Sequence, residues 1–130
     1  MKNSGPATES SLYQRIGGYD VIAKVIDDLF ALMRADARFS RFGTGRSLDS
    51  RKRAQQLTVE LLCSLAGGPC CYAGRSMKDS HGGLNITGSE WEASLDLTRK
   101  ALHKNGVANR EEAEFVSLFE RYRNDIVDAE

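Results

Sequence analysis

Residues 61–87 read LLCSLAGGPCCYAGRSMKDSHGGLNIT and join the end of an apolar helix to two glycine-rich loops. The Gly-Gly-Pro at residues 67–69 ends the helix, because proline cannot continue its hydrogen-bond ladder. His81 is one of only two histidines in the chain, and it lies on a helical turn that the glycines at 82–83 interrupt. An imidazole on so short a helix indicates a side chain that is directed at a ligand.

The rest of the chain predicts an all-α fold, because its apolar residues recur at the helical spacing of 3.6 residues. A helical turn is expected near residues 37–42, and four longer helices carry the apolar stripes. Helix starts are predicted at the polar caps Ser11, Asp20, Thr87 and Asn109, the last two as capping boxes. The longer helices are predicted at residues 20–36, 49–66, 88–104 and from 109 towards the C-terminus.

The composition bounds the domain organisation and the partners. A chain of 130 residues predicts one domain at residues 11–130 behind a flexible tail at residues 1–10. Eighteen basic residues balance eighteen acidic ones, which argues against nucleic acid or an anionic membrane surface as a partner. No apolar run is long enough for a membrane span, and no apolar signal segment is seen near the start, so a cytoplasmic protein is expected.

Three cysteines, Cys63, Cys70 and Cys71, are present. The number is odd, and a bond between the two neighbours would strain the peptide that joins them. We therefore expect reduced, partly buried thiols rather than a disulfide scaffold. The adjacent pair could alternatively sense oxidants or bind a soft metal, and the sequence leaves its role open.

The residue types around His81 favour some metal sites over others. A neutral imidazole is a good ligand for iron or zinc. No Cys or His stands at zinc-ligand spacing from it, and His103 belongs to a different helix, where it complements the helix dipole. Haem needs only one protein ligand, because the porphyrin supplies the other four. The residue types alone leave two readings of His81 open, a haem ligand and a structural histidine.

Four segments then carry a family resemblance in the same order. LYQRIGG at 12–18, GGPCCYAGR at 67–75, MKDSH at 77–81 and GLNIT at 83–87 resemble the group I truncated haemoglobins. The resemblance covers nearly the whole chain. It implies a shortened globin in which two antiparallel helix pairs, two over two, enclose a b-type haem, with His81 as the proximal iron ligand.

The same resemblance implies which side chains surround the haem. Arg75 and Lys78 are expected to pair with the propionates, and Trp91 to pack on the macrocycle. The phenylalanine that the family has at the haem edge corresponds to Gly43, next to Phe42. The expected cofactor-binding residues are Phe30, Phe42, Ala54, Leu57, Thr58, Leu61, Leu62, Tyr72, Arg75, Met77, Lys78 and Trp91.

On the distal side the chain departs from the family. The tyrosine that usually donates to bound oxygen corresponds to Phe30, and the glutamine-prone positions correspond to apolar residues and Thr58. Loss of one charge-assisted donor removes about 1.5–3 kcal/mol, or roughly a ten- to hundredfold change in oxygen release. We therefore expect weak oxygen retention. The expected distal pocket consists of Phe30, Ala54, Leu57, Thr58, Leu61 and Ser94.

Three functions are compatible with these features. The first is reversible binding of a diatomic gas (oxygen, carbon monoxide or nitric oxide) at the haem, for oxygen transport or sensing, by a monomer or weak dimer. The second is a haem enzyme, a nitric-oxide dioxygenase or weak peroxidase served by a reductase, which would require more polar distal groups. The third is a haem-free helical interaction module.

Overall fold

The computed structural model describes residues 10–43 and 47–128, and over these residues the chain is helical, without strands. The all-α prediction is confirmed. The predicted tail at residues 1–10 lies outside the described part except for Ser10. The helices are α1 (Leu12–Ile16), α2 (Tyr19–Ala35), η2 (Ala37–Phe39), α3 (Ser40–Gly43), α4 (Leu48–Leu65), α5 (Met77–His81), α6 (Gly88–Lys104), α7 (Asn109–Glu120) and α8 (Arg123–Ile126).

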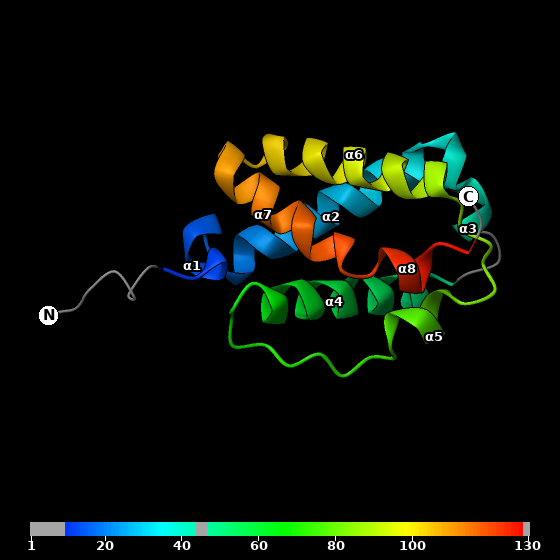
Figure 1. The fold of residues 1–130 in the computed structure, drawn as a ribbon, viewed down its shortest axis with the longest axis horizontal. Helices are drawn as coiled ribbons and strands as arrows, with labels where there is room; N and C mark the ends of the chain where they lie inside the picture. The colour runs from blue at the N-terminus through cyan, green and yellow to red at the C-terminus, as the bar shows by residue number, and fades with distance from the viewer. Residues whose placement is uncertain (1–9, 44–46, 129–130) are drawn as a thin grey trace, which may run out of the picture.

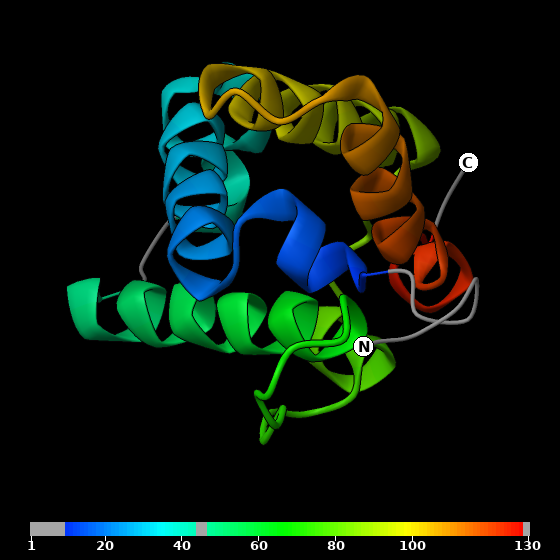
Figure 2. The same ribbon diagram turned by 90° about the vertical axis from the view of Figure 1, so that its left-hand side faces the viewer.

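Helix α2 packs against both α6 and α4 and forms one side of the fold between them (Figures 1 and 2). Ile22, Val25 and Ile26 of α2 are fully buried, and they share one apolar core with Leu102 of α6 and Phe115 of α7. Helix α1 lies against α2 and α7, while α5 contacts α8. Among the described helices, none combines the length and the hydropathy that a membrane span requires.

Two of the predicted helix caps are confirmed in detail. Ser11 Oγ accepts from the Gln14 backbone N–H at 3.1 Å, and the Gln14 side chain accepts from the Ser11 N–H in return. Thr87 and Glu90 make the same reciprocal pair at the start of α6, with distances of 3.1 and 3.0 Å. Each box satisfies two backbone donors that have no partner within the helix.

Two other predicted caps are wrong. Helix α2 begins after Gly18 rather than at Asp20, because positive φ angles at Gly17 and Gly18 turn the chain directly into the helix. Helix α7 begins after Ala108, without a side-chain cap, and Asn109 is already its first residue. In both cases the backbone path of the preceding loop, rather than a polar side chain, decides where the helix begins.

The expectation of three reduced thiols is also corrected. Cys63 and Cys70 form a disulfide, with Cα atoms 5.8 Å apart, while Cys71 is free and exposed. Gly67 has a φ of +95° and reverses the chain after α4, so Cys70 returns to the buried Cys63. The sequence pattern does not reveal this reversal, so the expectation weighed only a bond between the adjacent Cys70 and Cys71.

The disulfide makes a prediction about thiol chemistry. Without reductant, the denatured chain should expose one reactive thiol to Ellman's reagent, that of Cys71, and after reduction all three cysteines should react. Reduction should lower the free energy of unfolding by about 2.5 kcal/mol, because the closed loop restricts the unfolded chain. Three reactive thiols in protein purified under oxidising conditions would contradict the pairing.

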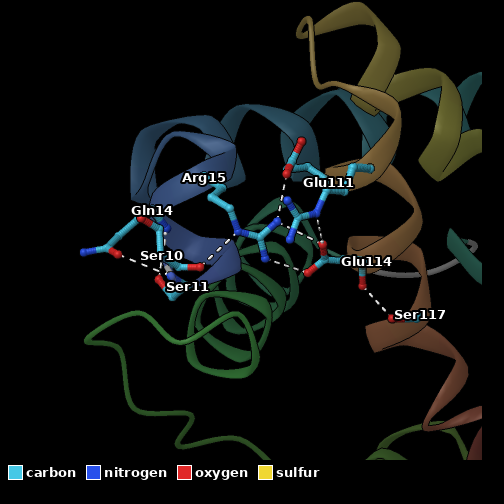
Figure 3. Close-up of polar contacts among 8 residues, drawn as sticks. Ser10, Ser11, Gln14, Arg15, Glu111, Glu114 and Ser117 are labelled. Atoms are coloured by element: carbon cyan, nitrogen blue, oxygen red, sulfur yellow. Dashed lines mark hydrogen bonds and ion pairs between the residues drawn. The ribbon is translucent and has the colours of Figure 1, made fainter. Parts of the chain in front are cut away.

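Arg15 connects α1 to α7 (Figure 3). Its guanidinium donates to Glu111 at 2.8 Å and to Glu114 at 2.6 Å, and its Nε donates to the Ser10 carbonyl at 3.0 Å. The hydrogen bond from Arg15 holds the pKa of Glu114 below its ordinary value of 4.5, although partial burial opposes this shift. The short first helix thus depends on a fork of charge-assisted hydrogen bonds.

A dependence of stability on pH follows. A carboxylate with a lowered pKa stabilises the fold above its ordinary pKa, and the contribution is lost as the pH falls towards the folded value. The free energy of unfolding, measured with urea, should therefore stay level above about pH 5 and fall below it. Arg15→Gln should be less stable at pH 7 and should lose less stability on acidification, because Glu114 then loses the largest cause of its lowered pKa. An acid slope unchanged by Arg15→Gln would rule out this role of the pair.

Candidate functional site

The short helix α5 carries the predicted ligand. Ser76 caps it by accepting from the Asp79 N–H at 3.1 Å, and the Gly82 N–H donates to the Lys78 carbonyl at 2.9 Å. Gly83 then takes a φ of +82°, a conformation that suits glycine and prevents the helix from continuing. The sequence therefore limits the helix to five residues and places His81 at its last position.

The ring of His81 is oriented by its own helix. Its Nδ1 lies 3.0 Å from the Met77 carbonyl oxygen and 2.9 Å from Ser80 Oγ. A carbonyl oxygen can only accept, and the Ser80 hydroxyl itself donates to the same carbonyl at 3.3 Å. The tautomer that fits both contacts carries a proton on Nδ1, which the Met77 carbonyl accepts. In a neutral ring this leaves the lone pair on Nε2, which has no hydrogen-bond partner in the described part of the chain.

This ring is half-buried and offers one nitrogen as a metal ligand. Within residues 10–43 and 47–128, no three His, Cys, Asp or Glu side chains gather into a metal-binding group. His103, the other histidine, is exposed near the end of α6, where its Nε2 lies against Glu112. The histidine that sequence reasoning selected is thus also the one whose geometry suits a ligand.

Helix α4 has two apolar faces that differ in burial. Val59, Leu62 and Cys63 are buried beside α2. The predicted cavity stripe is different, because Ala54, Leu57, Thr58 and Leu61 are only half-buried. Leu62, which is also expected beside the cofactor, is buried in the core. An apolar stripe that the protein covers only in part fits a flat apolar group such as a porphyrin.

The hydroxyl groups expected near the distal pocket are already used. Thr58 Oγ1 donates to the Ala54 carbonyl at 2.8 Å, and Ser94 Oγ donates to the Trp91 carbonyl at 2.6 Å. Each hydroxyl has one proton, so neither can donate to another group in this arrangement. Phe30 is half-buried on α2 and has no polar atom.

The glutamines of α4 point towards α2. Gln55 Nε2 donates to Asp27 Oδ1 at 3.0 Å, and Gln56 Nε2 donates to the Tyr19 hydroxyl at 2.8 Å. These bonds are what the apolar stripe of α4 predicts, because a helix that directs its apolar side chains to one face directs its amides elsewhere. Neither amide is available to the stripe that contains Thr58.

The loop before α5 is braced by Tyr72. Its hydroxyl donates to the Arg75 carbonyl, and its ring lies so close to Gly74 that a Cβ there would be 2.4 Å from the hydroxyl oxygen. Met77 is half-buried, whereas the side chains of Arg75 and Lys78 are exposed and have no carboxylate partner among the described residues. Two cations near His81 are therefore available to an anionic group.

Two aromatic residues of the predicted site, Trp91 and Phe42, already contact other parts of the protein. Trp91 is 5% exposed and belongs to the core of α6. Phe42 is half-buried beneath Arg41, whose guanidinium lies 4.0 Å from the ring centre and ion-pairs with Glu90 at 2.8 Å. Sequence reasoning missed this clamp, since nothing in the local pattern around Arg41 indicates a partner 49 residues away.

Comparison with known proteins gives a consistent picture. The model of the bacterial-like globin family matches residues 11–128. A group 1 truncated haemoglobin of Mycolicibacterium paratuberculosis is 36% identical over 81 residues, which cover 62% of this chain and 57% of that relative. A group 1 truncated haemoglobin of Nostoc commune is 33% identical over 99 residues, which cover 76% of this chain and 81% of the relative.

A solved structure shares the fold. The truncated haemoglobin from Tetrahymena pyriformis, in its Fe(III) form, superposes with a TM-score of 0.83 over 91% of this chain and 98% of that one. Its sequence identity is 23%. The arrangement of the helices is therefore the same, although fewer than one residue in four is identical.

Proposed function

Because the chain belongs to the bacterial-like globins, and among them to the group 1 truncated haemoglobins, we propose that it binds a b-type haem through His81 and reversibly binds a diatomic gas there. The two-over-two globin fold predicted from the sequence is confirmed together with the family. The family implies a haem-binding globin, and the individual residues and the properties of the gas site are our proposal.

The observation that carries the proposal is the hydrogen bond from His81 Nδ1 to the Met77 carbonyl, 3.0 Å long. This bond leaves the lone pair of the half-buried ring on Nε2, where it is free to bind a metal. In a metal-binding histidine, a hydrogen bond donated by the nitrogen that does not bind the metal orients the ring and makes the other nitrogen a more basic ligand.

The surrounding residues would hold the macrocycle. The half-buried apolar side chains of α4, together with Phe30, would cover its faces and exclude water. The free cations Arg75 and Lys78 would bind its propionates. A ferrous haem with one protein ligand supplies an open axial position at which oxygen, carbon monoxide or nitric oxide binds reversibly.

The distal residues favour weak retention of oxygen. Phe30 replaces a hydroxyl donor, and the protons of Thr58 and Ser94 are committed to their own helices. Bound oxygen gains more from a hydrogen-bond donor than carbon monoxide does. We therefore propose a gas site that favours carbon monoxide and nitric oxide by comparison, and in which oxygen is released quickly.

The two histidines permit a matched test of the axial ligand. His81→Ala should lose the Soret absorbance, or retain a haem that is weakly bound and lacks the axial nitrogen, because it removes the Nε2 ligand. His103→Ala should keep the wild-type ferric, ferrous and carbon-monoxide spectra. If purified wild-type protein shows no Soret band after haem addition, the chain is a haem-free helical module and the proposal is wrong.

The distal pocket can be tested by restoring the missing hydroxyl. Phe30→Tyr should slow oxygen release by roughly ten- to hundredfold, because it adds one donor to the bound oxygen. Phe119→Tyr, which adds the same group in α7, should leave the rate unchanged. Stopped-flow displacement of oxygen by carbon monoxide measures both rates. Slow oxygen release by the wild-type protein would show that a donor already exists.

A further inference from the structure

A polar groove lies between α2 and α4 and has no part in the proposed haem site. Its volume is about 520 Å³, and it is open to solvent along one side. Figure 2 shows α4 crossing α2 with its first turns extending beyond it. Asp27 and Arg34 of α2 line the groove together with Leu48, Arg51 and Lys52 of α4.

The groove carries an excess of positive charge. Arg34, Arg51 and Lys52 contribute three cations, against the single carboxylate of Asp27, so the lining has a net charge of 3 − 1 = +2. The Asp27 carboxylate already accepts from Gln55 Nε2 at 3.0 Å. None of the three cations has a hydrogen-bond or ion-pair partner in the part of the chain that the structure describes.

Arg51 differs from the paired arginines because a buried nitrogen of its guanidinium has no hydrogen-bond partner. Its side chain is half-buried, and its Nε is completely removed from solvent without a hydrogen-bond partner. By contrast, Arg15, Arg41 and Arg99 each lie 2.8 Å or less from a carboxylate. A buried N–H without a partner costs about 1–3 kcal/mol in general, and more when it belongs to a charged group. An acceptor from outside the chain would remove this cost.

The wall between the cations is apolar. Ala23 and Val59 line the groove together with Leu48, whose side chain is 57% exposed. A ligand that combines an anionic group with a hydrocarbon part would satisfy both features. The groove volume falls within the range of sites for small molecules.

We propose that this groove binds a small organic dianion, a phosphate monoester or a dicarboxylate, with Arg51 as the principal ligand. The guanidinium fork of Arg51 donates two hydrogen bonds to one oxyanion group, which is the geometry that arginine offers to phosphate and carboxylate alike. Arg34 and Lys52 neutralise the remaining charge, and the apolar wall receives the hydrocarbon part. The residues belong to a different face of α4 from Leu57 and Leu61, so the site is separate from the haem.

Isothermal titration calorimetry on the full chain tests the proposal, with phenyl phosphate, inorganic phosphate and succinate as probes. At physiological ionic strength, where charges are screened beyond about 8 Å, at least one dianion should bind with a dissociation constant of about 1 mM or lower. The probe with the lower dissociation constant shows whether the groove prefers a phosphate or a dicarboxylate. Absence of saturable binding by all three probes overturns the proposal.

Neighbouring residues provide matched variants. Arg51→Gln should weaken binding about tenfold or more, and Lys52→Gln should weaken it less, because it removes charge without the fork. Arg53→Gln removes the same charge two residues further along α4, from an exposed side chain outside the groove lining, and should leave the affinity nearly unchanged. Equal weakening by Arg51→Gln and Arg53→Gln would indicate unspecific attraction and would overturn the site.

The test does not depend on the haem. The same titration on His81→Ala protein should return the wild-type affinity, because the groove and α5 share no residue. Thermal unfolding of each variant, with and without phenyl phosphate, separates a folding defect from a loss of binding. A stable Arg51→Gln variant whose melting temperature still rises with phenyl phosphate, as the wild type's does, would also overturn the proposal.

Discussion

The hydrogen bond from His81 Nδ1 to the Met77 carbonyl is the contact on which the proposed site depends. It lies within a helix of five residues, so it needs no long-range packing to form, only the cap at Ser76 and the glycines that stop the helix. It decides which ring nitrogen keeps a lone pair. This histidine lies on a short helix between loops, and this position leaves Nε2 accessible to a ligand. A ring along the face of a longer helix would be surrounded by neighbouring side chains.

Two faces of helix α4 contribute to two different sites, the proposed haem site and the groove beside α2. One face carries Leu57 and Leu61, which the protein covers only in part and which we assign to the haem. Another carries Arg51 and Gln55, which face α2. Because the faces are separated around one rigid helix, a change in the groove leaves the residues of the haem face in place, and both sites can be examined independently.

Much of the fold could be predicted from local patterns. Ser11 and Thr87 form the expected capping boxes because all of their partners lie within three residues. The errors arose where distant or loop geometry decided the outcome. Asp20 and Asn109 look like caps in sequence, yet loop backbones begin those helices one residue or two earlier. The pairing of Cys63 with Cys70 depends on a chain reversal, and the clamp of Arg41 on Glu90 joins segments far apart in the sequence.

The sequence by itself determined the helical content and the family and led to the proposal of His81 as the ligand, because these follow from periodicity, from short-range capping and from ordered motifs. Only the tertiary structure decided which polar groups remain free. Arg15 and Arg41 find carboxylates on other helices, the Nε of Arg51 proves to be unpaired, and α2 and α4 enclose a charged groove. The physical reason is that a hydrogen bond is satisfied or left open by atoms from several helices at once, and no pattern along the chain records their distances.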